Sequence, residues 1–266
     1  MPLIAISDLD DPRLAPYRSL PTARRTRPAE TFVAEGRLLV VRLLASSLEV
    51  QSLLVRETAL AELRPHLPIE LPVYVAPRGL VNQIVGFTFH QGVMACGRRR
   101  PLATVRDLLP ADQRPLTVVI CPRIQDPDNL GQILRNGAAL GADLVVLGRG
   151  CADPFSRRAL RVSMGAAFTL PLAGTHDLPA DLAVLRHEAG VQLAAAVLDP
   201  RAEPLPTAAR PARFGLLLGN EYEGLDPDIL QLCDRQITLP MRPGTDSLNV
   251  ATASGIFLYH FGRPGG

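Results

Sequence analysis

Three segments of the sequence combine residue types that could hold a ligand and act on it. In the first, residues 126–135, Asn129 can cap a helix and Gly131 allows close approach to the first helical turn. Arg135 follows less than two turns later. An arginine there could bind a phosphate or stabilise a growing negative charge. Taken alone, the segment is more typical of a capped helix that carries a solvated arginine.

The second segment, residues 216–225, has the sequence Leu-Leu-Leu-Gly-Asn-Glu-Tyr-Glu-Gly-Leu. Gly219 and Gly224 have the spacing of the glycines in a phosphate loop. The Lys-Ser/Thr pair that such a loop requires does not follow Gly224, so we exclude that kind of nucleotide site. A glycine that ends a strand could still leave backbone groups open to a ligand, and a plain turn is the alternative.

The third segment begins as Ile-Thr-Leu-Pro-Met at residues 237–241 and continues as Ser-Leu-Asn-Val-Ala-Thr-Ala at residues 247–253. Ser247 and Asn249 stand where a helix would begin, and either side chain can cap it. The small residues that follow would allow this helix to pack closely against a neighbour. By itself this segment is an ordinary capped helix.

The elements that must position these segments alternate between strands and helices. Apolar strands that alternate with helices are typical of an α/β fold with a mostly parallel sheet covered on both faces. Each of the three segments begins where a predicted strand ends, and open α/β sheets bind ligands at that edge. The predicted strands are residues 116–121, 144–147, 191–198, 214–218 and 236–239; the helices are 129–140, 156–164, 182–189, 227–233 and 248–259; and residues 168–171 are expected to be extended.

The sequence before residue 100 predicts a separate, smaller domain. Leucines at helical spacing occur over residues 38–44, and short strands are predicted at 50–55 and 73–75. The run Arg98-Arg99-Arg100-Pro101 indicates a boundary. We therefore expect a domain at residues 1–100, a linker at 101–114 and a second domain at 115–266. Within residues 1–110, 14 arginines face 10 acidic residues, a surplus that suits phosphate binding.

Composition excludes several other classes of protein. The chain has 266 residues, is 47% hydrophobic and 20% charged, and is therefore globular. It lacks both a signal-like N-terminus and an apolar run of roughly 18 residues, so we expect a cytoplasmic protein with no membrane partner. Its four cysteines and five histidines lack metal-site spacing, so neither a metal site nor a disulfide is expected. The net charge of +2 gives no strong sign of a nucleic-acid partner, although its distribution along the chain is uneven.

In their order and spacing, the three segments resemble the SpoU (TrmH) family of the SPOUT class of RNA 2′-O-methyltransferases. They match its Asn-x-Gly-x-x-x-Arg, Leu-Gly-x-Glu-x-x-Gly-Leu and Ile-x-x-Pro-Met…Ser-Leu-Asn-Val-Ala signatures, and residues 161–166 resemble its Ser-x-Gly-Ala element. The resemblance is strong over residues 115–260. Upstream, residues 32–36 and 86–93 resemble the substrate-binding domain of many members, which is similar to a ribosomal-protein-type RNA-binding fold.

The resemblance implies a deep trefoil knot in the second domain, S-adenosylmethionine as cofactor, an RNA substrate and a homodimer. The residues that it implies in cofactor binding are Leu218, Gly219, Asn220, Leu239, Met241, Leu248 and Asn249. The residues that it implies in catalysis are Asn129, Arg135, Glu221, Ser247 and Asn249. For RNA binding by the first domain, the candidates are Arg24, Arg25, His90 and Gln91.

The chemistry implied is attack by a ribose oxygen on a methyl group that the cofactor already activates. Because the pKa of arginine lies above about 12, we expect Arg135 to hold a phosphate and stabilise developing negative charge rather than to remove a proton. Asn129 would fix the geometry of Arg135. Either Glu221 or Ser247 could relay the proton, and the sequence does not decide between them.

Two other functions, those of a dehydrogenase and of a non-catalytic RNA-binding protein, fit the sequence less well. A nicotinamide-dependent dehydrogenase is excluded, because residues 122–129 contain no glycine where its Gly-x-Gly-x-x-Gly loop would stand. A non-catalytic RNA-binding protein on the same fold is disfavoured by the presence of both Arg135 and Asn249. Large-subunit (23S) ribosomal RNA is the favoured substrate, because relatives with such a leading domain mostly modify it, and transfer RNA is the alternative.

Overall fold

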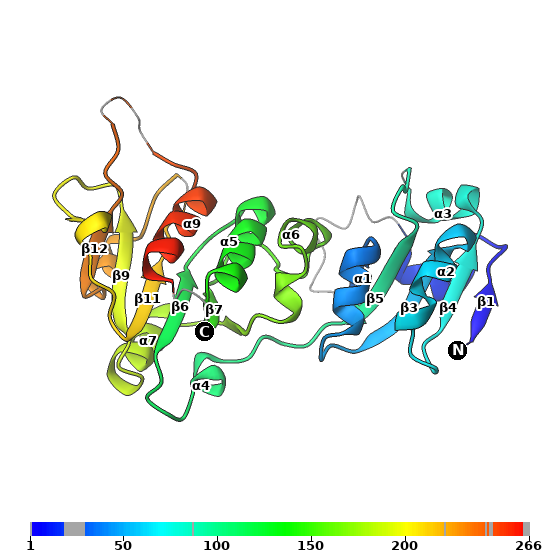
Figure 1. Ribbon diagram of the computed structural model, residues 1–266, viewed down its shortest axis with the longest axis horizontal. Helices are drawn as coiled ribbons and strands as arrows, with labels where there is room; N and C mark the ends of the chain where they lie inside the picture. Colours follow the sequence, from blue (N-terminus) through cyan, green and yellow to red (C-terminus); the bar gives the residue numbers. More distant parts are fainter. Residues whose placement is uncertain are drawn as a thin grey trace. The chain divides into compact units, whose positions relative to one another are not determined.

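A computed structural model describes residues 2–18, 30–86, 88–220, 222–242, 244 and 247–262. The chain divides into two compact units (Figure 1). The first consists of Met1–Pro101 together with Phe155–Thr169, and the second of Leu102–Pro154 together with Leu170–Gly266. Residues 102–114 therefore group with the second unit, and the segment 155–169, which the sequence predicted as part of the second domain, groups with the first.

The first unit is built on a mixed five-stranded sheet in the order β1-β4-β3-β5-β2. The parallel pairs are β1 with β4 and β4 with β3, whereas β5 runs antiparallel to both of its neighbours. The strands are β1 (Leu3–Ala5), β2 (Thr31–Glu35), β3 (Val50–Arg56), β4 (Val73–Ala76) and β5 (Val93–Arg98), and the helices are α1 (Arg37–Leu44), α2 (Leu60–Leu63) and α3 (Arg78–Val85).

Aromatic packing holds the segment 155–169 in the first unit. The ring of Phe32 on β2 lies 5.1 Å from that of Phe155 and 5.9 Å from that of Phe168, measured between ring centroids. Such pairs stabilise beyond the area that they bury. Helix α6 (Arg157–Val162) contacts the same strand, where Arg157 Nε lies 3.3 Å from the buried carboxylate of Glu35. These contacts explain why residues 155–169 group with the first unit, although the sequence predicted them as part of the second domain.

The second unit contains a seven-stranded sheet in the order β10-β12-β9-β11-β6-β7-β8, and every neighbouring pair is parallel. The α/β class with a mostly parallel sheet is thereby confirmed. The strands are β6 (Leu116–Cys121), β7 (Leu144–Leu147), β8 (Leu172–Gly174), β9 (Gln192–Val197), β10 (Glu203–Pro204), β11 (Arg213–Leu217) and β12 (Arg235–Thr238), and the helices are α4 (Val105–Leu108), α5 (Pro127–Ala139), α7 (Leu178–Ala183), α8 (Pro227–Gln231) and α9 (Val250–Phe261).

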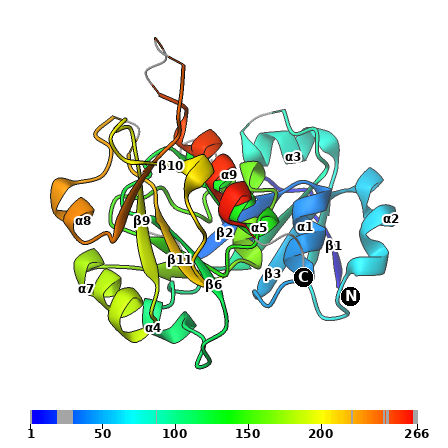
Figure 2. The ribbon, with the colours of Figure 1, turned by 60° about the vertical axis from the view of Figure 1, so that its left-hand side comes forward.

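Helices cover both faces of this sheet, as alternate residues of its strands require. On one face, Leu182 of α7 and Val105 of α4 belong to the same buried core as Val118 of β6. On the other face, Phe261 of α9 packs against Phe214 of β11, with ring centroids 4.3 Å apart. Helices α5 and α9 lie side by side (Figures 1 and 2). The second unit is therefore three-layered.

Two predictions of local structure differ from the observed elements by more than two residues, and one short strand was missed. The extended stretch predicted at 168–171 is wrong: a 3-10 turn occupies Ala166–Phe168 because Phe168 packs on Phe32, and β8 begins only at Leu172. The helix predicted from residue 182 begins at Leu178, because Asp177 caps it by accepting from the Ala180 amide. The short edge strand β10 was not predicted.

The cysteines of the protein are all free, and burial raises the pKa of the Cys121 thiol well above its usual value. Over the ranges that the structure describes, no three histidine, cysteine or acidic side chains gather as a metal site would require. No helix among the described residues is long and apolar enough to cross a membrane.

Candidate active site

The three segments singled out in the sequence meet at one edge of the second sheet. Strands β12, β9, β11 and β6 are neighbours and run parallel, so their carboxyl ends lie at the same edge. The loop after β6 leads into α5, the loop after β11 contains residues 218–226, and the loop after β12 leads into α9. Ligands of open α/β sheets bind at this edge.

The loop after β11 is a tight turn closed by its own backbone. The amide of Asn220 donates to the carbonyl of Gly224, and the amide of Gly224 donates back to that of Asn220, both at 2.9 Å. The side-chain amide of Asn220 donates to the Arg123 carbonyl at 3.2 Å, which joins this turn to the loop after β6. A Cβ atom on Gly219 would lie only 2.5 Å from the carbonyl carbon of Gly224. Only glycine therefore fits at position 219.

Gly219→Ala is expected to weaken binding of S-adenosylmethionine at least about tenfold, because the turn from 219 to 224 must open to admit the methyl group. Isothermal titration calorimetry measures this affinity. Gly79→Ala is the matched control, since a Cβ atom there has nothing within 4 Å. Equal cofactor affinity in the Gly219→Ala variant and the wild type would show that this turn does not shape the site.

Backbone groups at this edge are left open. Among the described residues, neither Gly219 nor Leu239 makes a backbone hydrogen bond to another group. Leu218 is buried beneath them, and Leu198, which directly follows the intervening strand β9, is 65% exposed. Free amides and carbonyls beside an exposed apolar side chain suit a ligand with a flat apolar face and polar edges. The adenosyl part of S-adenosylmethionine has that chemistry, so the donors present fit the cofactor.

The predicted residues Asn129 and Asn249 lie in direct contact. The side-chain amide of Asn249 donates to Asn129 Oδ1 at 2.8 Å, and Asn129 is buried at the start of α5. Asn249 also caps α9, because its Oδ1 accepts from the amides of Ala251 and Thr252. The two asparagines therefore join the first turns of α5 and α9.

Further along the two helices, Asn136 of α5 strengthens the same pairing. Its side-chain amide donates to the Ala251 carbonyl and to Ser254 Oγ of α9, both at 2.9 Å. A Cβ atom on Gly255 would lie 3.2 Å from Asn136 Nδ2. The small residues of α9 thus allow close packing against α5 of the same chain, which keeps the start of α9 fixed.

The side chain of Arg135 is exposed on α5 and makes no hydrogen bond or ion pair with any described residue. Its guanidinium is available to an anionic ligand. Ser247 and Leu248 are exposed in the loop before α9, and Met241 is half-buried in the loop after β12. The structure shows no contact that joins Ser247 to Arg135. Glu221 lies outside the described residues.

In the first unit, the two motifs predicted for RNA binding lie side by side. The Gly36 amide donates to the Val93 carbonyl at 2.9 Å, and Gln91 lies against Gly36. His90 and Gln91 are both exposed, and the His90 carbonyl accepts from Arg56. Arg24 and Arg25 lie outside the described residues.

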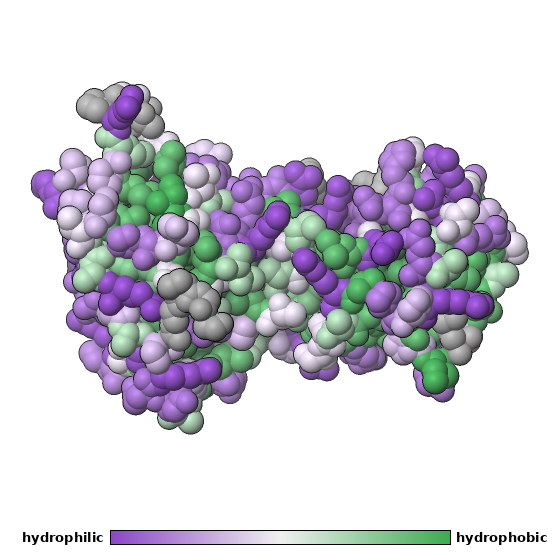
Figure 3. Space-filling view, viewed as in Figure 1, coloured by the Kyte–Doolittle hydropathy of each residue, from purple (hydrophilic) through white to green (hydrophobic). Residues whose placement is uncertain are grey.

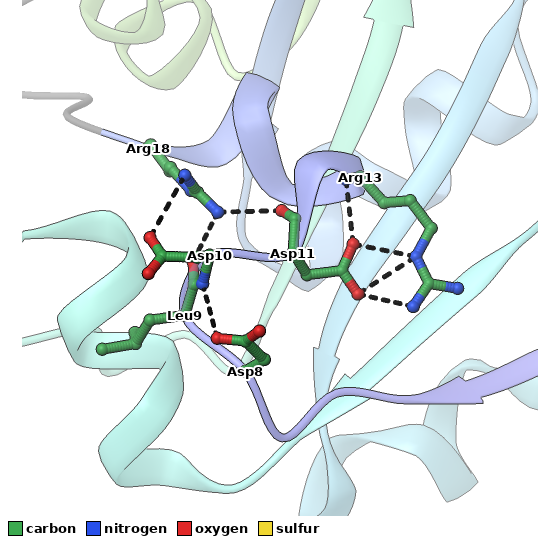
Figure 4. A network of polar contacts seen from close by, with 6 residues as sticks. All are labelled: Asp8, Leu9, Asp10, Asp11, Arg13 and Arg18. Atoms are coloured by element: carbon green, nitrogen blue, oxygen red, sulfur yellow. Dashed lines mark hydrogen bonds and ion pairs between the residues drawn. The ribbon is translucent and has the colours of Figure 1, made fainter.

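Some of the arginines of the first unit are already paired with acidic residues. Figure 4 shows Arg13 and Arg18 among three aspartates near the N-terminus. Arg13 Nε donates to the Asp11 carboxylate at 2.9 Å, and this contact lowers the pKa of Asp11 to about 2. Hydrophilic residues are spread over the face drawn in Figure 3 rather than gathered in one patch. The count of 14 arginines therefore overstates the number that are free to meet phosphate.

Two residues at the sheet edge were not among the predicted site residues. Leu198 follows β9 directly, between the loops of β11 and β12, and Arg123 follows β6 and forms an ion pair with Glu223 of the β11 loop. Both positions could have been found from the rule that ligands bind beyond the carboxyl ends of parallel strands. The sequence does not give the strand order, so it could not show that β9 lies between β11 and β12.

Comparisons with known proteins agree with this geometry. An uncharacterised tRNA/rRNA methyltransferase of Mycobacterium bovis is 39% identical, over 98% of this chain and 92% of that protein. The 23S rRNA (guanosine(2553)-2′-O)-methyltransferase RlmP of Bacillus subtilis is 29% identical, over 96% and 98%. The AdoMet-bound crystal structure of an rRNA methyltransferase from Sinorhizobium meliloti is 27% identical, with a TM-score of 0.83 and 97% of each chain covered. Residues 116–259 match the sequence model of the SpoU rRNA methylase family, and the chain belongs to that family.

Proposed function

We propose that this protein transfers a methyl group from S-adenosylmethionine to a ribose 2′-hydroxyl of large-subunit ribosomal RNA. The observation that carries the proposal is the joining of Asn129 to Asn249 at the sheet edge, beside the open backbone groups of Gly219 and Leu239. The ends of β11 and β12 at this edge can hold a cofactor, and the exposed Arg135 can face a substrate. The relatives and the matching structure that bear methyltransferase names support the same reaction.

Ribosomal RNA is the substrate that the relatives favour. RlmP of Bacillus subtilis is named for 23S rRNA and the Sinorhizobium meliloti protein for rRNA. Transfer RNA is the second candidate, since the name of the Mycobacterium bovis relative includes both RNA classes. We propose a cytoplasmic location for the enzyme and a reaction that requires no metal ion.

The residues of this chain have distinct tasks in the proposed reaction. Bound S-adenosylmethionine supplies an activated methyl group. Leu218, Gly219, Leu239, Met241 and Leu248 hold the cofactor, in part through the open backbone groups. Asn220 shapes the turn around it, and Asn249 fixes the start of α9.

On the substrate side, Arg135 binds the phosphate next to the target ribose and stabilises negative charge as the 2′-oxygen loses its proton. Asn129 orients the helix turn that carries Arg135. Ser247 or Glu221 relays this proton towards solvent water. Because the electrophile is already reactive, orientation and charge stabilisation are the main contributions of the protein.

We further propose that the chain forms a trefoil knot around this site. The support is topological: β12 lies near one end of the sheet, yet α9, which follows it, packs against α5, which follows β6. The loops 218–226 and 239–249 would be the knotted ones. For the first unit we propose a ribosomal-protein-like RNA-binding fold, supported by the adjoining motifs 32–36 and 88–93.

A homodimer through α9 is part of the proposal. The small residues of α9 were expected to allow close packing against a neighbour, and Ala251 and Ser254 pack on α5 of the same chain rather than on a partner. The support comes instead from the outer face of the helix, where Ile256 is 39% and Tyr259 80% exposed. Light scattering at micromolar concentration tests this, and a monomer that methylates RNA would contradict it.

Calorimetry tests the cofactor half of the proposal. The wild-type chain should bind one S-adenosylmethionine or S-adenosylhomocysteine per chain, and neither NAD nor ATP should compete. Saturable binding of NAD with no heat from either methionine cofactor would overturn the assignment.

A further inference from the structure

We propose that a cavity at the carboxyl ends of β7 and β8 holds one base of the substrate RNA, next to the nucleotide that is methylated. The cavity measures about 220 Å³ and lies in the second unit. The inference rests on the proposed function, because the base would belong to the RNA that the enzyme modifies. The residues that line the cavity include Leu102, Leu147, Gly148, Cys151, Ala152 and Thr175.

Thr175, one of the lining residues, carries a buried hydroxyl without a hydrogen-bond partner in the part of the chain that the structure describes. Thr175 is only 4% exposed, and its Oγ1 atom has no hydrogen-bond partner among the described residues. Its backbone amide donates to the Leu147 carbonyl at 3.0 Å, so the residue itself is fixed. A buried hydroxyl without a partner is unfavourable, and a polar atom of a ligand that it reaches would relieve this. A hydroxyl can both donate and accept, so it can meet either kind of atom on a base edge.

The size and lining of the cavity fit a single base better than a larger ligand. Pockets for drug-sized molecules measure roughly 300–1,000 Å³, so this cavity is too small for the whole cofactor. The lining is largely apolar, as the flat face of a base requires. Arg149, His176 and the acidic Asp153 are exposed at the same cavity, and Arg149 or His176 can meet the phosphate or stack on the base. Single-stranded RNA presents bases in this splayed form.

The cavity is tied to the loop that precedes α5. The Gly148 amide donates to the Cys121 carbonyl at 2.9 Å, and the Ala152 amide donates to the Ile124 carbonyl at 2.7 Å. Cys151 Sγ adds contacts to the same loop, accepting from the Ile124 amide and donating to the Cys121 carbonyl. The wall of the cavity and the start of α5 therefore keep a fixed relation.

The loop after β6 also bonds to the cofactor turn. The Arg123 carbonyl accepts from Asn220, and its side chain pairs with Glu223. Strands β6 and β8 are separated by β7 alone, and neighbouring strands lie about 4.8 Å apart, so the cavity lies on the order of 10 Å from the end of β6. A neighbouring nucleotide can bridge that span while the target ribose lies at Arg135.

Two variants test the cavity. Thr175→Val removes the hydroxyl and keeps the shape, and Ala152→Leu fills the cavity with apolar atoms. Both variants should reduce kcat/KM for RNA about tenfold or more, with unchanged affinity for S-adenosylmethionine. Thr207→Val is the control for loss of a threonine hydroxyl away from the cavity: Thr207 is exposed in the same unit, and its hydroxyl donates to the Pro204 carbonyl. The melting temperature of Thr175→Val should not fall, since its hydroxyl bonds to no described residue.

A second readout separates this inference from the proposed function. Saturation-transfer NMR is run on the full chain with AMP, CMP, GMP and UMP in turn, with saturating S-adenosylhomocysteine present to block the cofactor site. At least one nucleotide should bind at millimolar concentration to the wild type and to Thr207→Val, and binding should be lost in Ala152→Leu.

The outcomes are distinct. Wild-type kcat/KM for RNA in both cavity variants would overturn the inference and leave the cavity to a buried water, even if the enzyme methylates RNA. If the wild type methylates no RNA, the proposed function fails. In that case the nucleotide binding measured by NMR decides. Loss of binding in Ala152→Leu supports a base site. Equal binding in the wild type and Ala152→Leu, or no binding in either, overturns it.

Discussion

Replacement of Arg135 by alanine is expected to slow methyl transfer about 100-fold or more while the affinity for S-adenosylmethionine stays the same. Arg135 is exposed on α5, and its guanidinium makes no hydrogen bond or ion pair with described residues that its loss would remove. It is therefore available to the RNA alone, and its removal takes away stabilisation of developing charge. Single-turnover transfer of labelled methyl groups to RNA measures the rate, and calorimetry measures the cofactor affinity.

Two further variants make this result interpretable. Arg135→Lys keeps the charge but loses the planar fork, so it should recover only part of the rate. Arg106→Ala is the control, because it removes an exposed arginine that lies outside α5 and pairs with Glu188. A surface ion pair of this kind contributes at most about 1 kcal/mol to the stability of the fold. Arg106→Ala should methylate RNA normally. Wild-type single-turnover rates in Arg135→Ala would refute the role assigned to this residue.

Asn249→Asp is expected to reduce methyl transfer by about tenfold or more without unfolding α9. The aspartate can still accept from the amides of Ala251 and Thr252, so the helix cap survives. It cannot donate to Asn129 Oδ1, so the link between α5 and α9 is replaced by repulsion between two oxygens. The change should lower both cofactor affinity and the methylation rate, since both helix starts border the site.

Loss of the cap itself can be measured separately. Asn249→Ala removes the cap and the link together, whereas Asp177→Ala removes a cap from α7 alone. Each cap is worth about 1 kcal/mol of stability, so both alanine variants should melt at lower temperature. Asp177→Ala should keep its methylation rate. If Asn249→Asp methylated as fast as the wild type, the contact between the two asparagines would have no part in catalysis.

The sequence alone predicted much of the second unit because its strands are continuous apolar runs separated by capped helices. The strand at residues 116–121 agrees with the structure at both ends. The three motifs predicted one site, although their separation in the chain hides the contact between Asn129 and Asn249. That contact depends on the order of the strands in the sheet and on the packing of α9 against α5. The hydrophobic periodicity of the sequence shows neither.

The segment 155–169 shows where sequence patterns fail. Its helix was predicted, but the unit in which it packs depends on Phe155 and Phe168 meeting Phe32 from a distant strand. Gly97 permits this meeting, because a Cβ atom there would lie 2.4 Å from the Phe32 ring. No local pattern signals such a fit. A truncated chain beginning near Arg114 would expose these aromatic rings, so the full chain is required for functional tests.

The methyl group is expected on a ribose 2′-oxygen of ribosomal RNA, and one measurement tests this directly. Unmodified large-subunit ribosomal RNA is incubated with the protein and S-adenosylmethionine labelled in its methyl group, then digested to nucleosides and separated. The label should appear in a single 2′-O-methylnucleoside, and Arg135→Ala should yield almost none. Label in a base-methylated nucleoside, or no transfer to ribosomal or transfer RNA by a protein that binds the cofactor, would contradict the account.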